Sequence, residues 1–276
     1  MNARDFIELT RAPAALTLPG DSLAGGATGI APMLSSVCLY WAGMALNDHA
    51  DRAIDAKERP ERPIPSGRVR PGEALAIAVA LTGAGLAAAA LSGRRRVLGT
   101  AVPLAAVVWA YDLKLKDTAL GPAAMAAARG LDVLLGADAD AEASADAVRA
   151  AASVAAHTYG ITVLSRGEVT GGRPASAAIA LTGTAAAAAL AWRKGDRGIS
   201  VLGRLAAYAV TVSGPQLRAI RTPDPGTTRT AVSAGILGLP LLQAALIAGR
   251  GRPLPALAVA AACPLARLLG RKVSPT

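Results

Sequence analysis

Apolar runs of about twenty residues recur along the whole sequence, and each run ends at a Gly, a Pro or a group of charges. A helix of this length crosses the hydrocarbon core of a bilayer, where it satisfies its own backbone polar groups. Only 17% of the residues are charged and 53% are hydrophobic, whereas soluble domains carry about 25% charged residues. The sequence therefore predicts an all-α, polytopic transmembrane helix bundle that forms one integral domain over residues 1–276.

The number of spans depends on the first of them, which contains Pro19, Gly20 and Asp21 and is the weakest helix candidate. We therefore expect nine or ten helices. Many spans are rich in Ala and Gly, and such small residues let helices approach closely in lipid. The predicted spans are residues 14–32, 33–50, 73–92, 97–112, 119–137, 147–165, 175–192, 200–219, 230–248 and 253–270.

The net charge of +10 does not indicate nucleic-acid binding, because the basic residues lie in short loops between apolar runs. Most of them fall on one side of the predicted topology, and the acidic loop "ADADAEASADAV" falls on the other. The positive-inside rule then predicts a multi-pass protein of the cell inner membrane whose basic loops are cytoplasmic. The N-terminal "MNARDFIELTRAP" lacks the basic region of a signal peptide, so we expect the first helix to be retained.

The stretch "ALNDHADRAIDAKERPERPIPSGRV" interrupts this apolar pattern with closely spaced acids. Asn47, Asp51 and Asp55 recur every four residues, so on a helix they form an acidic ladder along one face, with Asp48 beside it. Neighbouring acids repel one another and are costly near a membrane, which implies a bound cation. The ladder spans roughly 12 Å at 1.5 Å per residue, so two Mg²⁺ ions that share Asp51 would fit.

A metal site with few protein ligands points to a phosphorylated ligand, because Mg²⁺ completes its shell with waters and substrate phosphates. Arg62, Arg68 and Arg70 follow the acidic ladder, and arginine suits phosphate oxygens. For these three arginines the alternative is a solvated loop whose charge only sets topology.

The segment "NDHADRAID" resembles the N-D-x-x-D-x-x-x-D motif of the UbiA superfamily of intramembrane prenyltransferases. The following "RPIPSGRV" matches the R-P-[IL]-x-S-G of that superfamily. Weaker matches are "TRAP", similar to an N-terminal Arg-x-Pro, and "YDLKLKDTALGP", similar to Y-S-x-x-K-R-x-x-x-x-G. The resemblance extends from about residue 10 to residue 220 and leaves the final predicted span outside it.

This resemblance implies a helix bundle around a central cavity, in which two Asp-rich motifs face each other and hold a prenyl diphosphate through Mg²⁺. It makes Asn47, Asp51 and Asp55 metal ligands, with Asp51 and Asp55 also catalytic. It makes Lys114 the diphosphate-binding base.

The second Asp-rich motif of the superfamily, D-x-x-x-D-x-x-G, corresponds here to "LSRGEVTGG". Glu168 takes the place of the last Asp and would be its catalytic and metal-binding residue, whereas Leu164 replaces the first Asp. Either Arg166 supplies positive charge in place of a second metal, or Glu168 and waters hold that metal. An Asp restored at position 164 is expected to be tolerated. Such an altered motif is similar to that of an EboC-like branch of the superfamily.

Several residues inside the spans have two possible roles. Arg129 and Asp132, three residues apart, either pair with each other or place Arg129 beside the diphosphate. His157 is expected to be a hydrogen-bonded core residue, and the alternative is a base that takes a proton from the acceptor. Tyr40 or Trp41 lies about two turns below Asn47, where a ring could stabilise an allylic cation.

These observations favour a Mg²⁺-dependent prenyltransferase that moves a prenyl group from a polyprenyl diphosphate to a small acceptor within the lipid bilayer. The alternative is a non-catalytic membrane protein that binds or transports a lipid diphosphate. A transporter would be expected to show inverted repeats and broken helices, and neither is evident in the sequence. An aromatic acid, a polyol, a cyclitol or another lipid all stay open as acceptors.

Overall fold

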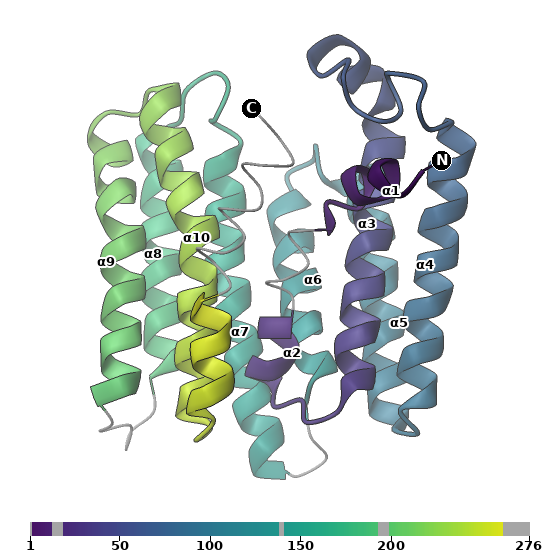
Figure 1. The fold of residues 1–276 in the computed structure, drawn as a ribbon. Coiled ribbons are helices and arrows are strands. Elements are labelled where there is room, and N and C mark those ends of the chain that lie inside the picture. Colours follow the sequence, from purple (N-terminus) through teal and green to yellow (C-terminus); the bar gives the residue numbers. More distant parts are fainter. Residues whose placement is uncertain (1, 13–18, 138–140, 193–198, 262–276) are drawn as a thin grey trace.

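The computed structural model describes residues 2–12, 19–137, 141–192 and 199–261. Within these ranges the chain is helical and contains no β-strand, which confirms the predicted all-α class (Figure 1). Residues 253–261 are also helical. The elements are α1 (Ala3–Leu9), α2 (Pro19–Gly25), α3 (Ile30–Glu58), α4 (Pro71–Leu91), α5 (Arg95–Ala110), the π-helical turn η2 (Tyr111–Leu115), α6 (Gly121–Leu135), α7 (Ala141–Ser165), α8 (Pro174–Ala191), α9 (Ile199–Arg221) and α10 (Pro225–Gly249).

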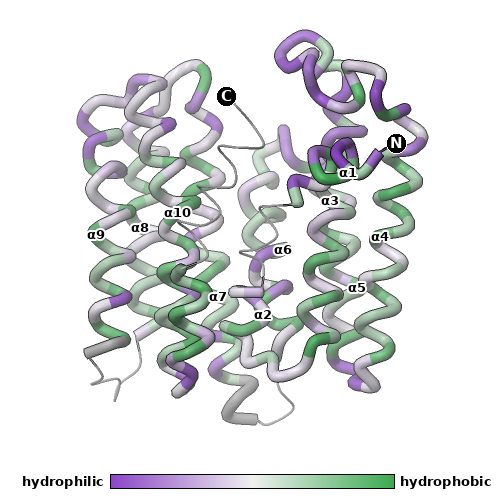
Figure 2. The backbone as a smooth tube through the Cα atoms, in the orientation of Figure 1, coloured by the Kyte–Doolittle hydropathy of each residue, from purple (hydrophilic) through white to green (hydrophobic). Residues whose placement is uncertain are grey.

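Five helical segments in the described residues are long and apolar enough to cross a membrane. They are α3, α4, α5 together with η2, α8 and α10. The other long helices, α6, α7 and α9, run alongside them between the same two ends (Figure 1). Figure 2 shows hydrophobic residues along the middle of the helices and hydrophilic residues gathered mainly at the two ends. This distribution confirms a polytopic bundle built for a bilayer.

Helices that follow each other in the sequence pack side by side, so the chain passes up and down through the bundle. The short helix α2 lies among α3, α6, α7 and α10 and joins the first part of the bundle to the last. Glycines allow the closest approach here, because a Cβ on Gly25 or Gly136 would overlap a backbone carbonyl of the facing segment. The expected packing through small residues is therefore realised between α2 and α6.

The first predicted span, residues 14–32, is not one membrane-crossing helix. The structure has the seven-residue α2 in this region, and residues 13–18 lie outside the described part of the chain. Gly26 directly follows α2, and its positive φ of 113° ends the helix. The last predicted span is described only up to residue 261, so its remaining residues are likewise outside the structure.

The two ends of the bundle differ in what they carry. One end, which we call the motif end, holds α1, the C-terminal end of α3, the 59–70 loop and the loops after η2 and α7 (Figure 1, top). The other end holds the α4 to α5 turn and the start of α7. The acidic ladder and the segment matching the second Asp-rich motif therefore meet at the same end, as their predicted topology requires.

Candidate active site at the motif end

The acidic ladder lies on a continuous helix, because α3 extends past the apolar run to Glu58. Asp48 and Asp55 are buried, and the guanidinium of Arg62 bridges them at 3.4 Å and 2.6 Å. Arg11 supplies a second cation to Asp48 at 3.0 Å. Unpaired acids at this depth would be costly, so these arginines explain how α3 carries several acids in succession.

Arg11 reaches Asp48 from an uncommon backbone conformation. Its φ is 48°, in the left-handed region, and it is the only non-glycine residue with positive φ in the described chain. Such strain persists where the surroundings hold it and often marks functional sites. Arg11 belongs to the "TRAP" segment, which is similar to the N-terminal Arg-x-Pro of the superfamily.

Arg68 does not face the acidic ladder. Its Nη1 contacts Asp5 Oδ1 at 2.8 Å and Glu8 Oε2 at 2.7 Å, and both acceptors belong to α1. Burial alone would raise the pKa of Glu8, but hydrogen bonds from Arg68 and Arg4 bring that pKa below its usual value. Arg68 therefore fastens α1 to the 59–70 loop, a structural role that the sequence did not predict.

The turn after α5 delivers two side chains to the acidic ladder. It contains the π-helix η2, and π-helical turns often occur at functional sites. Asp112, in η2, is buried and accepts a 3.2 Å hydrogen bond from Asn47 Nδ2. Just after η2, Lys116 pairs its ammonium group with the carboxylate of Asp51.

Lys114, the predicted diphosphate-binding base, has an exposed side chain. Lys116, two residues later, is the lysine that contacts the acidic ladder, through Asp51. The family pattern contained a signal for this, because the sixth position counted from Tyr111 in Y-S-x-x-K-R is Lys116. Asp112 occupies the position of the Ser in the same pattern.

The segment that matches the second Asp-rich motif is arranged differently. Leu164 is fully buried, at 0% exposure, in an apolar cluster that includes Ile161 and Val232. Burial raises the pKa of Glu168, and the nearby charge of Arg229, on α10, opposes that rise. The charge that acts on Glu168 thus comes from Arg229, and no contact between Glu168 and the acidic ladder is seen in the described part of the chain.

Arg166 links this second segment to the rest of the site through the backbone. Its guanidinium donates hydrogen bonds to the carbonyl oxygens of Thr118 and Lys116, the latter at 3.3 Å. These carbonyls belong to the turn that carries the Lys116 ammonium to Asp51. Arg166 therefore supports the position of Lys116, and no contact with the acids of the ladder is recorded for it among the described residues.

The described residues contain no group of three or more His, Cys, Asp and Glu side chains that could hold a metal. The four predicted ligands, Asn47, Asp51, Asp55 and Glu168, are therefore not gathered in one such group. Asn47 and Asp51 nevertheless offer oxygen donors one helical turn apart, and Mg²⁺ binds through a few carboxylates plus waters and phosphate oxygens. This donor set fits Mg²⁺ that arrives with a diphosphate.

Arg129 and Asp132 do not pair with each other. Arg129 contacts Asp21 of α2 at 2.9 Å, and Asp132 accepts a 3.0 Å hydrogen bond from Ser36 Oγ. Gln243, on α10, also donates to Asp21, at 2.6 Å. Ser36 lies about three turns of α3 further from the motif end than Asn47. Arg129 thus holds α2 inside the bundle, well below the acidic ladder.

His157 and the aromatic residues of α3 follow the sequence predictions more closely. His157 is buried and contacts the Tyr208 hydroxyl at 2.8 Å and the Gly235 carbonyl at 3.1 Å, which confirms a hydrogen-bonded core histidine. Trp41 packs edge-on against Phe6 of α1. Tyr40 lies on another side of α3, within electrostatic range of Arg129 and Arg11, and is the ring that shares the face of Asn47.

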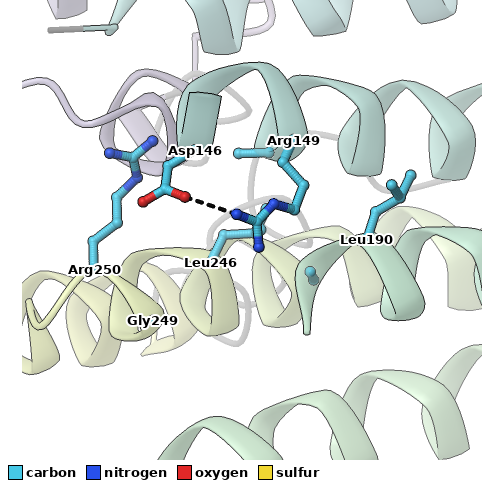
Figure 3. A pocket seen from close by; sticks show the side chains of 8 residues that line it. Asp146, Arg149, Leu190, Leu246, Gly249 and Arg250 are labelled. Atoms are coloured by element: carbon cyan, nitrogen blue, oxygen red, sulfur yellow. Dashed lines mark hydrogen bonds and ion pairs between the residues drawn. The ribbon is translucent and has the colours of Figure 1, made fainter. Parts of the chain in front are cut away.

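A small pocket lies at the opposite end of the bundle and contains none of the predicted site residues. It lies among α7, α8 and α10, and Arg149 donates to Asp146 within it at 2.9 Å (Figure 3). Arg250 at its edge also donates to the Ala24 carbonyl at 2.8 Å, which fastens α10 to α2. This pocket therefore does not bring together the predicted metal- and phosphate-binding residues.

The sequence model of the UbiA prenyltransferase family matches residues 13–267, so the chain belongs to this family. Among curated relatives, the digeranylgeranylglyceryl phosphate synthase of Methanopyrus kandleri is 34% identical over 125 residues, 42% of this chain and 46% of that protein. The protein of the same name from Methanospirillum hungatei is 40% identical over 79 residues, 29% of this chain and 28% of that protein. The chain thus spans less than half the length of these curated relatives.

Solved structures show the same fold over most of the chain. One concerned with digeranylgeranylglyceryl phosphate synthase in membranes has a TM-score of 0.67 at 19% identity and covers 89% of this chain and 97% of its own. A UbiA homologue from Archaeoglobus fulgidus bound to GPP and Mg²⁺ has a TM-score of 0.53 at 16% identity. The match covers 85% of this chain and 99% of that chain. At these identities the likeness concerns the fold alone.

Proposed function

We propose that this chain is a Mg²⁺-dependent intramembrane prenyltransferase that moves a prenyl group from a polyprenyl diphosphate to a small acceptor. The acidic ladder on α3 carries the proposal, because its acids lie at the end of a membrane-crossing helix with Arg11, Arg62 and Lys116 around them. Membership of the family supports the reaction class. The Archaeoglobus fulgidus homologue, bound to GPP and Mg²⁺, supports the proposed donor and metal.

The cations of the site can pair either with the carboxylates of the acidic ladder or with a diphosphate. Substrate binding is proposed to exchange the first partner for the second. In the structure, Lys116 neutralises Asp51, and Arg62 neutralises Asp55. When a diphosphate enters, these cations donate to its oxygens, which arginine does through two parallel hydrogen bonds. The freed carboxylates of the acidic ladder and the Asn47 amide would then be available to hold Mg²⁺. Bound Mg²⁺ would withdraw negative charge from the departing diphosphate.

The reaction breaks the bond between the prenyl C1 and the diphosphate oxygen, and the electron pair leaves with that oxygen. The allylic cation that remains forms a bond to the nucleophilic atom of the acceptor, which then loses a proton. Tyr40 is seven residues before Asn47, about two turns deeper on the same face. We propose that its ring stabilises the cation through its π face.

Relatives supply the first acceptor to test. Their name describes a glyceryl phosphate that carries two geranylgeranyl groups. We therefore propose geranylgeranyl diphosphate as donor and singly geranylgeranylated glyceryl phosphate as acceptor, with aromatic acids and polyols as the comparison set. The motif end, with its basic 59–70 loop, is proposed to face the cytoplasm of a cell inner membrane.

The test follows inorganic diphosphate release and lipid products by mass spectrometry, with the purified protein in liposomes across a Mg²⁺ series. We expect product that needs Mg²⁺ and that disappears in Asp51→Asn. Asp117→Asn, which removes the same charge from an exposed position nearby, serves as the matched control. Tight, Mg²⁺-dependent binding of the donor without diphosphate release, with every acceptor, would instead identify a non-catalytic lipid-diphosphate-binding protein.

A further inference from the structure

The segment that matches the second Asp-rich motif brings no carboxylate to the acidic ladder. Leu164 is buried among apolar side chains, and Glu168 lies near the cation Arg229. A carboxylate does face the ladder from a different element. Asp112, in η2, is only 4% exposed and lies beside Asn47 and Asp51.

The packing of η2 against α3 makes room for this carboxylate. Gly43 is one turn below Asn47 on α3, and a Cβ there would lie 2.9 Å from Val108 Cγ1 and 3.6 Å from Asp112 Oδ2. A larger residue would press on Val108 and push η2 away from the ladder. The glycine thus allows the close approach that places Asp112 opposite Asn47.

Asp112 lacks a full countercharge in this arrangement. Its hydrogen-bond donor is the neutral amide of Asn47, and among the described residues no ion pair to Asp112 is found. Two cations, Lys116 and Arg11, act on it electrostatically, but Lys116 is already paired with Asp51 and Arg11 with Asp48. A buried carboxylate in this position is costly unless a cation compensates it. Because Nδ2 of Asn47 points to Asp112, the Asn47 amide oxygen is left to bind the same cation.

We infer that Asp112 is a metal ligand of this chain and supplies the carboxylate that position 164 lacks. The Mg²⁺ site is then built from Asn47 and Asp51 on α3 and from Asp112 on η2, not from two facing Asp-rich motifs. This inference rests on the proposed function, since it names the metal ligands of that same site. It also gives the π-helix a purpose, because the widened turn sets the direction of Asp112 and places Lys116 on Asp51.

The test measures Mn²⁺, a paramagnetic substitute for Mg²⁺, by electron paramagnetic resonance on the full chain in nanodiscs with geranyl thiodiphosphate present. Asp112→Asn keeps the shape of the side chain and an oxygen that accepts from Asn47, but removes the charge. We expect at least about tenfold weaker Mn²⁺ binding, because loss of even an outer-shell partner of a metal ligand typically weakens metal binding by about 10–100-fold. The control Asp117→Asn should bind as the parent does. Asp112→Glu, which returns the charge, should recover part of the affinity.

The outcomes separate this inference from the proposed function. Parent-like Mn²⁺ binding in Asp112→Asn, with binding lost in Asp51→Asn, would overturn the role of Asp112 and leave the proposed function standing. Parent-like binding in both variants would remove the metal from α3 and overturn both. If Asp112→Asn does not fold, as judged by its elution profile and thermal unfolding, Asp112→Ser is read in its place, since it carries the residue of the family pattern.

Discussion

The acidic ladder on α3 and the segment after α7 lie at the same end of the bundle, but they use charge in opposite ways. The carboxylates of the ladder and of the adjacent Asp48 are paired with Arg11, Arg62 and Lys116. The other segment has Leu164 in the apolar core and uses Arg166 to support the turn that carries Lys116. The ladder can therefore exchange its ion pairs for metal and diphosphate, while the segment after α7 holds the Lys116 turn in position beside it.

The largest effect should come from removing the centre of the ladder. Asp51→Ala takes away a metal ligand and leaves Lys116 partly exposed, so folding should be little changed. Loss of the Asp51 carboxylate removes a charged contact to the bound metal and diphosphate, and removing one partner of such a contact costs about 2–5 kcal/mol. Mg²⁺-dependent binding of a prenyl thiodiphosphate should therefore weaken by about a hundredfold. Calorimetric titration checks this. Unchanged affinity would mean that the ladder and the segment after α7 do not differ as we describe.

Leu164→Asp tests the segment after α7 through stability. The sequence predicted that an acid restored here would be tolerated, but the side chain is completely buried in the apolar cluster. A buried carboxyl group without partners costs about 2–7 kcal/mol, so we expect a clearly lower melting temperature in detergent. Leu164→Met, which keeps the volume, should cost less than about 1.5 kcal/mol. Equal melting temperatures for both variants would show that position 164 opens onto the polar site.

Glu168→Gln compares the two candidate sources of the missing carboxylate. Because Glu168 lies near Arg229 and not at the acidic ladder, its neutralisation should change the Mg²⁺ concentration for half-maximal turnover by less than about threefold. Asp112→Asn should change it by more. The two variants are assayed side by side over one Mg²⁺ series. A larger shift for Glu168→Gln would return the second Asp-rich motif to its usual metal-binding role.

The sequence predicted best what depends on neighbouring residues. The helix that carries Asn47, Asp51 and Asp55 follows from their spacing, and most predicted spans correspond to α3–α10 because apolar runs and their breakers are local signals. Contacts between distant segments could not be read in this way. Arg129 pairs with Asp21, far earlier in the chain, although Asp132 is its nearest acid in sequence.

The position of Lys116 shows a second limit of local patterns. A regular helix through residues 111–116 presents each side chain in a direction that its neighbours define, but the π-helix η2 widens the turn and changes that direction. Nothing in the run "YDLKLK" marks a π-helix, so the direction of the Lys116 side chain could not be predicted, although the family pattern aligns its last basic residue with Lys116. The same turn directs Asp112 to Asn47.

The smallest effect should come from the contacts of Arg68 with Asp5 and Glu8 of α1, which we call the clasp. They lie at the edge of the site, away from the acidic ladder. Arg68→Ala removes the contacts to Asp5 and Glu8 and should weaken diphosphate binding by at most about fivefold, since partly exposed ion pairs contribute about 1 kcal/mol or less. It should also speed hydrogen exchange of the amides in α1. Arg70→Ala is the matched control, because Arg70 pairs with Glu73 at the surface and does not touch α1.

The same clasp should depend on pH in a direction that the Glu8 carboxylate sets. Its pKa in the folded protein lies below the ordinary 4.5, so the ionised form is favoured by folding. The contribution is complete above about 4.5 and is lost as the pH falls through the lower, folded value. Hydrogen exchange of α1 in the parent should therefore approach that of Arg68→Ala only in acid, after correction for the intrinsic rate. Equal protection of α1 in Arg68→Ala and Arg70→Ala would show that the packing of Phe6 on Trp41 holds α1 without the clasp.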